Sequence, residues 1–199
     1  MNLKVDPRAR GLIFDIDGTL IDTMPIHFRA WQEVAGKFDF EYPESLFYKL
    51  AGMPTGDIII YINENQGKAL DPDEIVKAKN EAYLRLNRAI RVIEPVIKIV
   101  EENHGKIPMA LGTGEYRDVA LVNLKVTGID HYFDKLVSAD DVINSKPHPE
   151  TFLKCAQLMN VPPETCQVFE DGEAGLEAAG RARMIVTDVR PFINKDVSD

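Results

Sequence analysis

The sequence predicts an α/β protein with a parallel sheet covered by helices on both faces, together with an inserted all-helical cap domain. Short apolar runs bounded by turn residues alternate with helical patterns through the C-terminal half of the chain. Such alternation implies right-handed crossovers between parallel strands, as in Rossmann-like sheets. From about residue 23 to residue 90 no convincing strand pattern occurs, so this segment is expected to form a helical insertion.

Each element of the sheet domain follows from an apolar run or from a helix with a start or stop signal. Pro95 and Pro149 open two of the expected helices, and the sequences His104-Gly105 and Thr127-Gly128 end two of them. The expected strands are 11–16, 107–112, 135–139, 167–170 and 184–188, and the expected helices are 95–103, 115–126, 149–159 and 173–181.

The insertion is expected to contain a helix opened by Pro25, shorter helical pieces, and a long helix over about 71–89. The apolar run Ile58–Ile62 is compatible with a strand, but Gly56 and the Gln66-Gly67 stop frame it at helical length. The predicted domains are therefore a core over 1–22 and 90–199 and a helical cap over 23–89, joined near 19–23 and 88–95.

Composition restricts the classes of partner. The 199 residues carry a formal net charge of -9, which argues against nucleic acid or an anionic membrane as a general partner. No apolar run is long enough for a membrane span, and the N-terminus has no apolar secretory segment. Two cysteines without a CxxC motif make no disulfide framework, so a cytoplasmic location is expected.

Polar side chains follow the first four expected strands. Ligands of open parallel sheets bind outside the carboxyl ends of the strands, where these side chains should meet. Taken one at a time, they are also compatible with turn residues, helix caps or surface positions. The set is Asp15, Asp17, Thr113, Gly114, Lys146, Glu170 and Asp171.

This set predicts phosphate chemistry assisted by a metal. Carboxylates clustered without histidine or thiol partners suit Mg²⁺, and a hydroxyl, a lysine and exposed N–H groups suit a phosphate. Attack by a carboxylate on a phosphate is opposed by repulsion of ~1 kcal/mol per charge pair at ~4 Å in water, and ~4 kcal/mol at an effective dielectric near 20. Lys146 supplies one compensating charge, and Mg²⁺ would supply two more.

Four sequence motifs lie in one order along nearly the whole chain. They are DIDGT at 15–19, an apolar strand ending in Thr113, Lys146 in SKPHPE, and Glu170-Asp171 in FEDGEAG. Together they resemble the motifs of the haloacid-dehalogenase-like phosphotransferases. Within that superfamily, DTMPIHFRAW at 22–31 and AKNEAY at 78–83 resemble the beta-phosphoglucomutase-like group, which carries a helical cap at this place.

The resemblance implies a role for each core residue. Asp15 would be the nucleophile that becomes phosphorylated, and Asp17 would be the general acid–base. Thr113, the N–H of Gly114 and Lys146 would hold phosphate oxygens. The Mg²⁺ ligands would be the carboxylates of Asp15 and Asp171 and the backbone carbonyl of Asp17, while Glu170 would ligate or orient the metal waters.

Two cap residues are candidates for contact with the substrate. Lys79 interrupts the apolar stripe of Ile75, Ala82 and Leu86, which fits either a lysine whose head group reaches solvent or a substrate-facing lysine as in the family. His27 falls on the stripe of Trp31, so it is either a partly buried histidine with satisfied hydrogen bonds or a substrate contact.

Three functions are compatible with these motifs: a phosphatase, a mutase and a non-catalytic phosphate-binding module. The mutase relatives carry an arginine after a Gly-x-Ser element, where this chain has Pro54 and Thr55, and Glu115 replaces a serine of the loop after the second strand. These changes remove positive charge from, and add negative charge to, the expected binding site for a second phosphate, although Arg117 or Lys79 could compensate. The pattern resembles phosphatases of the fructose-1-phosphate or 6-phosphogluconate type, so we expect a phosphatase acting on a small phosphorylated sugar or sugar acid. A beta-phosphoglucomutase-type mutase is the alternative. A non-catalytic phosphate-binding module is more remote, since it should have lost the acidic residues.

Overall fold

The computed structural model describes residues 3–50 and 55–193 of the chain. The chain divides into two compact units. The core unit comprises Met1–Asp22 and Ile90–Asp199, and the helical unit comprises Thr23–Ala89.

The core unit is built on a five-stranded sheet of strand order β5-β4-β1-β6-β7, in which all neighbouring strands run parallel. Ile13 in the central strand pairs with Ala110 on one side and with Val168 on the other. The three central strands are buried throughout, as expected for a parallel sheet covered on both faces. The strands are β1 (Gly11–Phe14), β4 (Met109–Gly112), β5 (Leu136–Val137), β6 (Cys166–Glu170) and β7 (Ile185–Asp188).

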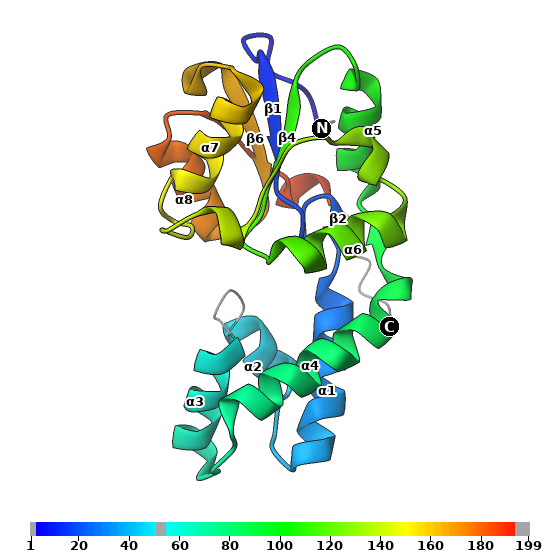
Figure 1. Cartoon of the computed structure of the whole chain (residues 1–199), viewed down its shortest axis with the longest axis vertical. Coiled ribbons are helices and arrows are strands. Elements are labelled where there is room, and N and C mark those ends of the chain that lie inside the picture. Colours follow the sequence, from blue (N-terminus) through cyan, green and yellow to red (C-terminus); the bar gives the residue numbers. More distant parts are fainter. Residues whose placement is uncertain (1–2, 51–54, 194–199) are drawn as a thin grey trace. The chain divides into compact units, whose positions relative to one another are not determined.

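Helices cover both faces of this sheet, with α7 and α8 on one side and α5 and α6 on the other (Figure 1). Gly128 ends α6 and Asn160 ends α7, both in the left-handed conformation that commonly terminates helices. Phe152 and Cys155 of α7 pack with Ile13 and Val168 in the core between helices and sheet. The helices are α5 (Glu94–Asn103), α6 (Arg117–Thr127), α7 (Glu150–Met159) and α8 (Glu173–Arg181), with short 3-10 turns η2 (Asp130–Tyr132), η3 (Ala139–Asp141), η4 (Pro163–Thr165) and η5 (Arg190–Phe192).

The helical unit contains no strand among its described residues. The run Ile58–Ile62 lies within a helix, which confirms the helical prediction over the strand alternative. Asp71 caps the long helix of this unit by accepting a 2.9 Å hydrogen bond from the N–H of Asp73. The elements are α1 (Met24–Phe38), α2 (Glu44–Lys49), α3 (Thr55–Gln66), α4 (Pro72–Leu86) and the 3-10 turn η1 (Asn87–Ala89).

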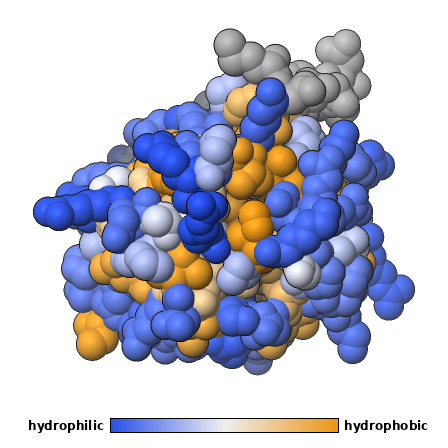
Figure 2. Space-filling view, turned by 90° about the horizontal axis from the view of Figure 1, so that it is seen from above, coloured by the Kyte–Doolittle hydropathy of each residue, from blue (hydrophilic) through white to orange (hydrophobic). Residues whose placement is uncertain are grey.

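The expected elements are all present, within a few residues at their ends, and one further pairing was not predicted. The two-residue strands β2 (Ile21–Asp22) and β3 (Arg91–Val92) form an antiparallel pair in the core unit. Two residues are too few to produce an alternating pattern in the sequence. In the described ranges no helix has the length and apolarity needed to cross a membrane. On the face in Figure 2, hydrophilic residues are interspersed with hydrophobic ones.

Candidate active site

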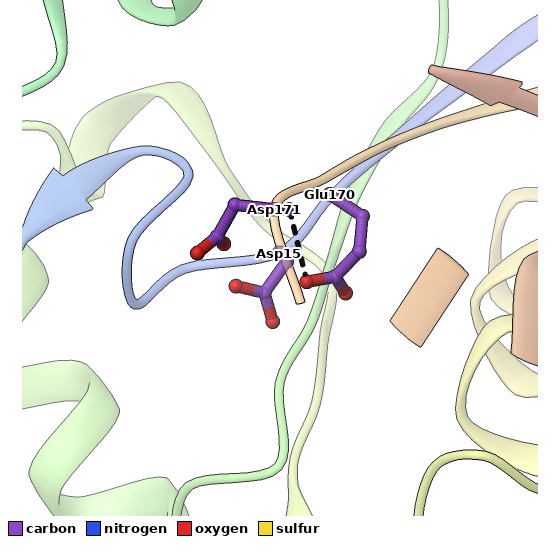
Figure 3. Close-up of side chains that lie close together, drawn as sticks. All are labelled: Asp15, Glu170 and Asp171. Carbon is purple, nitrogen blue, oxygen red and sulfur yellow. Dashed lines mark hydrogen bonds between the residues drawn. The ribbon is translucent and has the colours of Figure 1, made fainter. Parts of the chain in front are cut away.

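Three carboxylates from two adjacent strands meet at the carboxyl end of the sheet. Asp15 directly follows β1, while Glu170 ends β6 and Asp171 follows it. Because Phe14 pairs with Phe169, the two strand ends lie next to each other. Oxygen atoms of the three carboxylates lie within 4.8 Å of one another (Figure 3). The expected convergence of Asp15, Glu170 and Asp171 is thus present in the structure.

Lys146 joins the first and fourth motifs. Its Nζ lies 2.7 Å from Oδ1 of Asp15 and 2.8 Å from Oε2 of Glu170. The lysine side chain is 11% exposed, and its head group also lies 4.7 Å from the centre of the Phe152 ring. Burial alone would lower the pKa of Lys146, but the charges of Asp15 and Glu170 outweigh burial and raise that pKa above its usual value.

One lysine does not balance the three carboxylates. Burial raises the pKa of Asp15 well above its usual range, and the charges of Glu170 and Asp171 add to that rise while Lys146 opposes it. Burial also raises the pKa of Asp171. A buried cluster of oxygen ligands with excess negative charge fits a hard divalent cation, whose charge would favour the ionised form of both groups.

Asp171 is oriented by Thr19, a contact that the sequence did not predict. The Thr19 hydroxyl is fully buried and donates a 2.7 Å hydrogen bond to Oδ1 of Asp171, 152 positions away. Gly18, between Asp17 and Thr19, has φ of +87°, and a Cβ there would lie 2.3 Å from Oδ2 of Asp171. The glycine and threonine of DIDGT therefore make room for Asp171 and hold its carboxylate.

Glu170 is fixed on both of its oxygens. Its Oε1 accepts hydrogen bonds from the N–H groups of Asp171 at 3.1 Å, drawn in Figure 3, and of Gly172 at 2.9 Å, while Oε2 accepts from Lys146. Gly175, inside α8, is the second residue that the sequence analysis missed. A Cβ at Gly175 would lie 1.9 Å from Oε2 of Glu170, so only glycine leaves space for this carboxylate. The sequence feature that could have identified Gly175 is its position inside a helical pattern, where a glycine usually has a packing or functional reason.

Thr113 lies one residue past the end of β4, the neighbour of β1 on the other side. The side chain is 1% exposed, and its Oγ1 accepts a 3.0 Å hydrogen bond from the N–H of Glu115. Gly114 is exposed within the same loop. Asp17 is half-buried in the turn after β1, where the N–H of Gly18 donates to the carbonyl of Ile21 at 2.8 Å. All the core candidates thus lie on the same edge of the sheet.

The described contacts of the Arg117 side chain are with Leu136 and Asp141. One guanidinium nitrogen donates to Oδ2 of Asp141 at 2.6 Å and to the carbonyl of Leu136 at 3.0 Å. The N–H of Arg117 donates to Asp140, and Glu115 accepts from the N–H of Tyr116. These contacts involve one guanidinium nitrogen of a side chain that is 42% exposed, so the suggestion that Arg117 compensates for the missing cap arginine stays a prediction.

Within the helical unit, the two candidate substrate residues share one neighbour. The ring of His27 stacks on that of Tyr83 with 4.4 Å between centroids, and Nζ of Lys79 lies 5.4 Å from the same ring. Lys79 as a whole is buried, with 8% of the residue exposed. Burial and the charge of Lys79 lower the pKa of His27 to about 3. Pro54, part of the loop compared with the mutases, lies outside the described residues.

The chain is similar over most of its length to known phosphate-transferring proteins. Residues 12–189 match the family of haloacid dehalogenase-like hydrolases. Fructose-1-phosphate phosphatase YqaB of Escherichia coli is 43% identical over 183 residues, which are 92% of this chain and 97% of that protein. Phosphorylated carbohydrates phosphatase of Thermotoga maritima is 32% identical, over 86% of this chain and 80% of that protein.

Structural similarity extends to the mutases. The crystal structure of beta-phosphoglucomutase from Clostridium difficile superposes with a TM-score of 0.73 at 26% identity, covering 90% of this chain and 84% of that one. The predicted fold class and the resemblance to the beta-phosphoglucomutase-like group are thereby confirmed. The family match spans β1 through β7, and with it Asp15, Lys146 and the Glu170-Asp171 pair, so the chain belongs to the haloacid dehalogenase-like hydrolases.

Proposed function

We propose that this protein is a Mg²⁺-dependent phosphatase that hydrolyses a small sugar phosphate, or sugar-acid phosphate, through an aspartyl-phosphate intermediate. The observation that carries the proposal is the position of Lys146, whose ammonium group bridges Asp15 and Glu170 next to Asp171. This arrangement combines an anionic nucleophile with a fixed positive charge at the carboxyl edge of a parallel sheet.

In the first step, an oxygen of the Asp15 carboxylate attacks the phosphorus atom. The bond from phosphorus to the sugar oxygen breaks, and Asp17 transfers a proton to that leaving oxygen. In the second step, Asp17 accepts a proton from water, which attacks the phosphorus atom, releases inorganic phosphate and restores the Asp15 carboxylate. The Thr113 hydroxyl, the N–H of Gly114 and Lys146 hold the phosphate oxygens throughout.

Asp15, Asp171, Glu170 and the carbonyl of Asp17 would hold Mg²⁺, which when bound supplies two positive charges next to the phosphate oxygens. Burial, with the neighbouring carboxylates, raises the pKa values of Asp15 and Asp171 in the metal-free protein, which supports this assignment. A bound cation would lower the pKa of Asp15 and so favour its ionised, nucleophilic form.

The proposed substrate class rests on the relatives, and the choice of hydrolysis over mutase chemistry rests on sequence changes at the expected binding site for a second phosphate. The two phosphatases named above act on phosphorylated carbohydrates according to their names. A mutase must also retain a bisphosphate, which needs further cationic groups. In this chain Glu115 lies in the loop after β4, and one guanidinium nitrogen of Arg117 donates to Asp141 and to the carbonyl of Leu136. These contacts favour hydrolysis over phosphoryl return to the sugar. Lys79 and His27 of the helical unit are proposed to contact the sugar.

The test is a panel of sugar phosphates incubated with Mg²⁺, with inorganic phosphate and isomer conversion measured in the same samples. We expect phosphate release from small sugar phosphates and its loss, by a factor of at least ~10³, in Asp15→Asn. Asp130→Asn, on an exposed 3-10 turn, is the control and should retain full activity. Conversion of beta-glucose 1-phosphate to glucose 6-phosphate faster than phosphate release would favour the mutase instead. Activity surviving in Asp15→Asn would remove Asp15 as the nucleophile.

A further inference from the structure

The segment that carries Lys146 has one apolar anchor, Val142 at its start, which packs against the hydrophobic core. Residues 142–149 connect η3 to α7 without regular secondary structure. Ile143, the isoleucine of this segment, is 92% exposed. Yet Nζ of Lys146 must be held within hydrogen-bond distance of both Asp15 and Glu170. Polar contacts therefore have to help order the residues after Val142, and we call residues 142–149 the Lys146 loop.

Glu150, the first residue of α7, supplies three of these contacts. Its Oε1 accepts a 3.0 Å hydrogen bond from the N–H of Ile143, and its Oε2 accepts from the N–H of Asn144 at 3.0 Å and from Nδ2 of Asn144 at 3.1 Å. The carboxylate thus ties the start of the loop to the helix at its end. Lys146 lies between these two points, two residues after Asn144 and four before Glu150.

The carboxylate of Glu150 is itself held by the next turn of α7. Nζ of Lys154 lies 2.8 Å from Oε1 of Glu150 and also donates to the carbonyl of Asp141, just before the loop. The hydrogen bond from Lys154 and those from the N–H groups of Ile143 and Asn144 lower the pKa of Glu150 to about 2. Glu150 is therefore ionised throughout the physiological range, and its contacts with the loop are charge-assisted.

A second part of the network reaches the loop after β4. Asp141 accepts hydrogen bonds from the N–H and the hydroxyl of Ser138 and pairs with Arg117 at the start of α6. The loops that carry Thr113 and Lys146 are therefore both tied to the segment 138–141. Disturbing Glu150 would release the Lys146 side of this network while leaving the contacts of Arg117 intact.

We propose that Glu150 is a positioning residue for the reaction, which acts by fixing the loop that presents Lys146 to Asp15 and Glu170. The proposal rests on the proposed function, because it assumes that Lys146 supports phosphoryl transfer. Glu150 itself touches neither the carboxylate cluster nor the phosphate-binding groups among its described contacts. Displacements of about 1 Å in such supporting contacts can cost on the order of 100-fold in rate.

The experiment compares Glu150→Ala, Glu150→Gln and Glu177→Gln in the full-length chain. Glu177 pairs with Arg181 at i,i+4 in α8, as Glu150 pairs with Lys154 in α7, so it is a matched control for the loss of a helical ion pair. We expect Glu150→Ala to lower kcat/KM on the order of 10-fold or more. Glu150→Gln should recover part of the loss, because the amide oxygen still accepts from the loop, and Glu177→Gln should have no effect.

A double variant separates positioning from general destabilisation. If Glu150 acts through Lys146, adding Glu150→Ala to Lys146→Met should cause little further loss of kcat/KM. Multiplicative losses, or full activity of Glu150→Ala, would overturn the proposal. Hydrogen exchange provides a readout besides activity, since the amides of Ile143 and Asn144 should exchange faster in Glu150→Ala than in Glu177→Gln. If the wild-type protein released no phosphate, the proposed function would fail, whereas unchanged exchange at these two amides would refute the role of Glu150 in ordering the loop.

Discussion

The ammonium group of Lys146 lies 2.7 Å from Oδ1 of Asp15, and each of the two side chains is at most 11% exposed. The pair connects the first strand with a loop 131 positions further along the chain. Asp15, the candidate nucleophile, also lies next to the carboxylates of Glu170 and Asp171. Lys146 is the fixed positive charge that offsets part of this negative charge. Removing that charge leaves the carboxylate cluster without a protein cation among its described contacts.

Lys146→Met is expected to lower kcat/KM by at least ~100-fold, because it removes the fixed charge beside the nucleophile and the transferring phosphate. The measurement is steady-state phosphate release in saturating Mg²⁺. Lys135→Met removes a lysine whose head group pairs with Asp134 and is the control. Equal activity of the two variants would show that the charge of Lys146 is not required.

Gly175→Ala is expected to reduce activity by displacing Glu170, because the new Cβ would lie 1.9 Å from Oε2 of that residue. Gly180 belongs to the same helix, and apart from its chain neighbours and the backbone of the helix itself nothing lies within 4 Å of a Cβ added there. Gly180→Ala should therefore retain activity and gain up to about 1 kcal/mol of stability from helix propensity. Phosphate release and thermal unfolding of both variants check the contrast. A fully active Gly175→Ala would mean that the placement of Glu170 tolerates a shift.

His27 is expected to make the protein less stable in acid. Burial and the charge of Lys79 lower the pKa of His27 to about 3, so between pH 6.5 and about 3 the unfolded chain binds more protons at this residue than the folded chain. The folded state therefore loses up to about 1.4 kcal/mol per pH unit as the pH falls through this window.

Urea unfolding between pH 4 and pH 7 measures this slope. His27→Gln should flatten it, whereas His104→Gln, at an exposed position, should not. A wild-type slope unchanged by His27→Gln would contradict the assignment. His27→Gln and Lys79→Met should also raise KM for the sugar phosphate if these residues contact the sugar, with Lys77→Met, on an exposed part of the same helix, as the control.

The sheet and the positions of the acidic residues followed from local patterns, whereas the supporting contacts did not. Apolar runs ending in Asp15, Thr113 and Glu170 identified the strands and the edge at which ligands bind. The bond from Thr19 to Asp171 and the space that Gly175 leaves for Glu170 depend on how elements pack after folding. In the sequence, Glu150 is an ordinary acidic residue at the start of a helix. Its contacts with the N–H groups of residues 143 and 144 depend on how the loop folds back, which no local pattern predicts.

Asp171→Asn separates metal binding from catalysis by its effect on stability. Burial raises the pKa of Asp171 above its usual value, so at neutral pH its ionised form costs the metal-free protein stability. Replacement by asparagine removes that charge, while the amide oxygen can still accept the hydrogen bond from Thr19. We therefore expect Asp171→Asn to raise the Tm measured in EDTA.

The rise in Tm that Mg²⁺ produces should require the Asp171 carboxylate. A ligand that binds only the folded state stabilises it by about 1.4 kcal/mol at ten times its Kd, so Mg²⁺ should raise the Tm of the wild-type protein. In Asp171→Asn the carboxylate cluster loses one ligand charge, and the Mg²⁺-dependent rise should shrink or vanish. Asp188→Asn, at the end of β7, serves as the control, because its carboxylate pairs with Arg190. If Mg²⁺ raised the Tm of Asp171→Asn as much as that of the wild type, the metal would have to bind without Asp171.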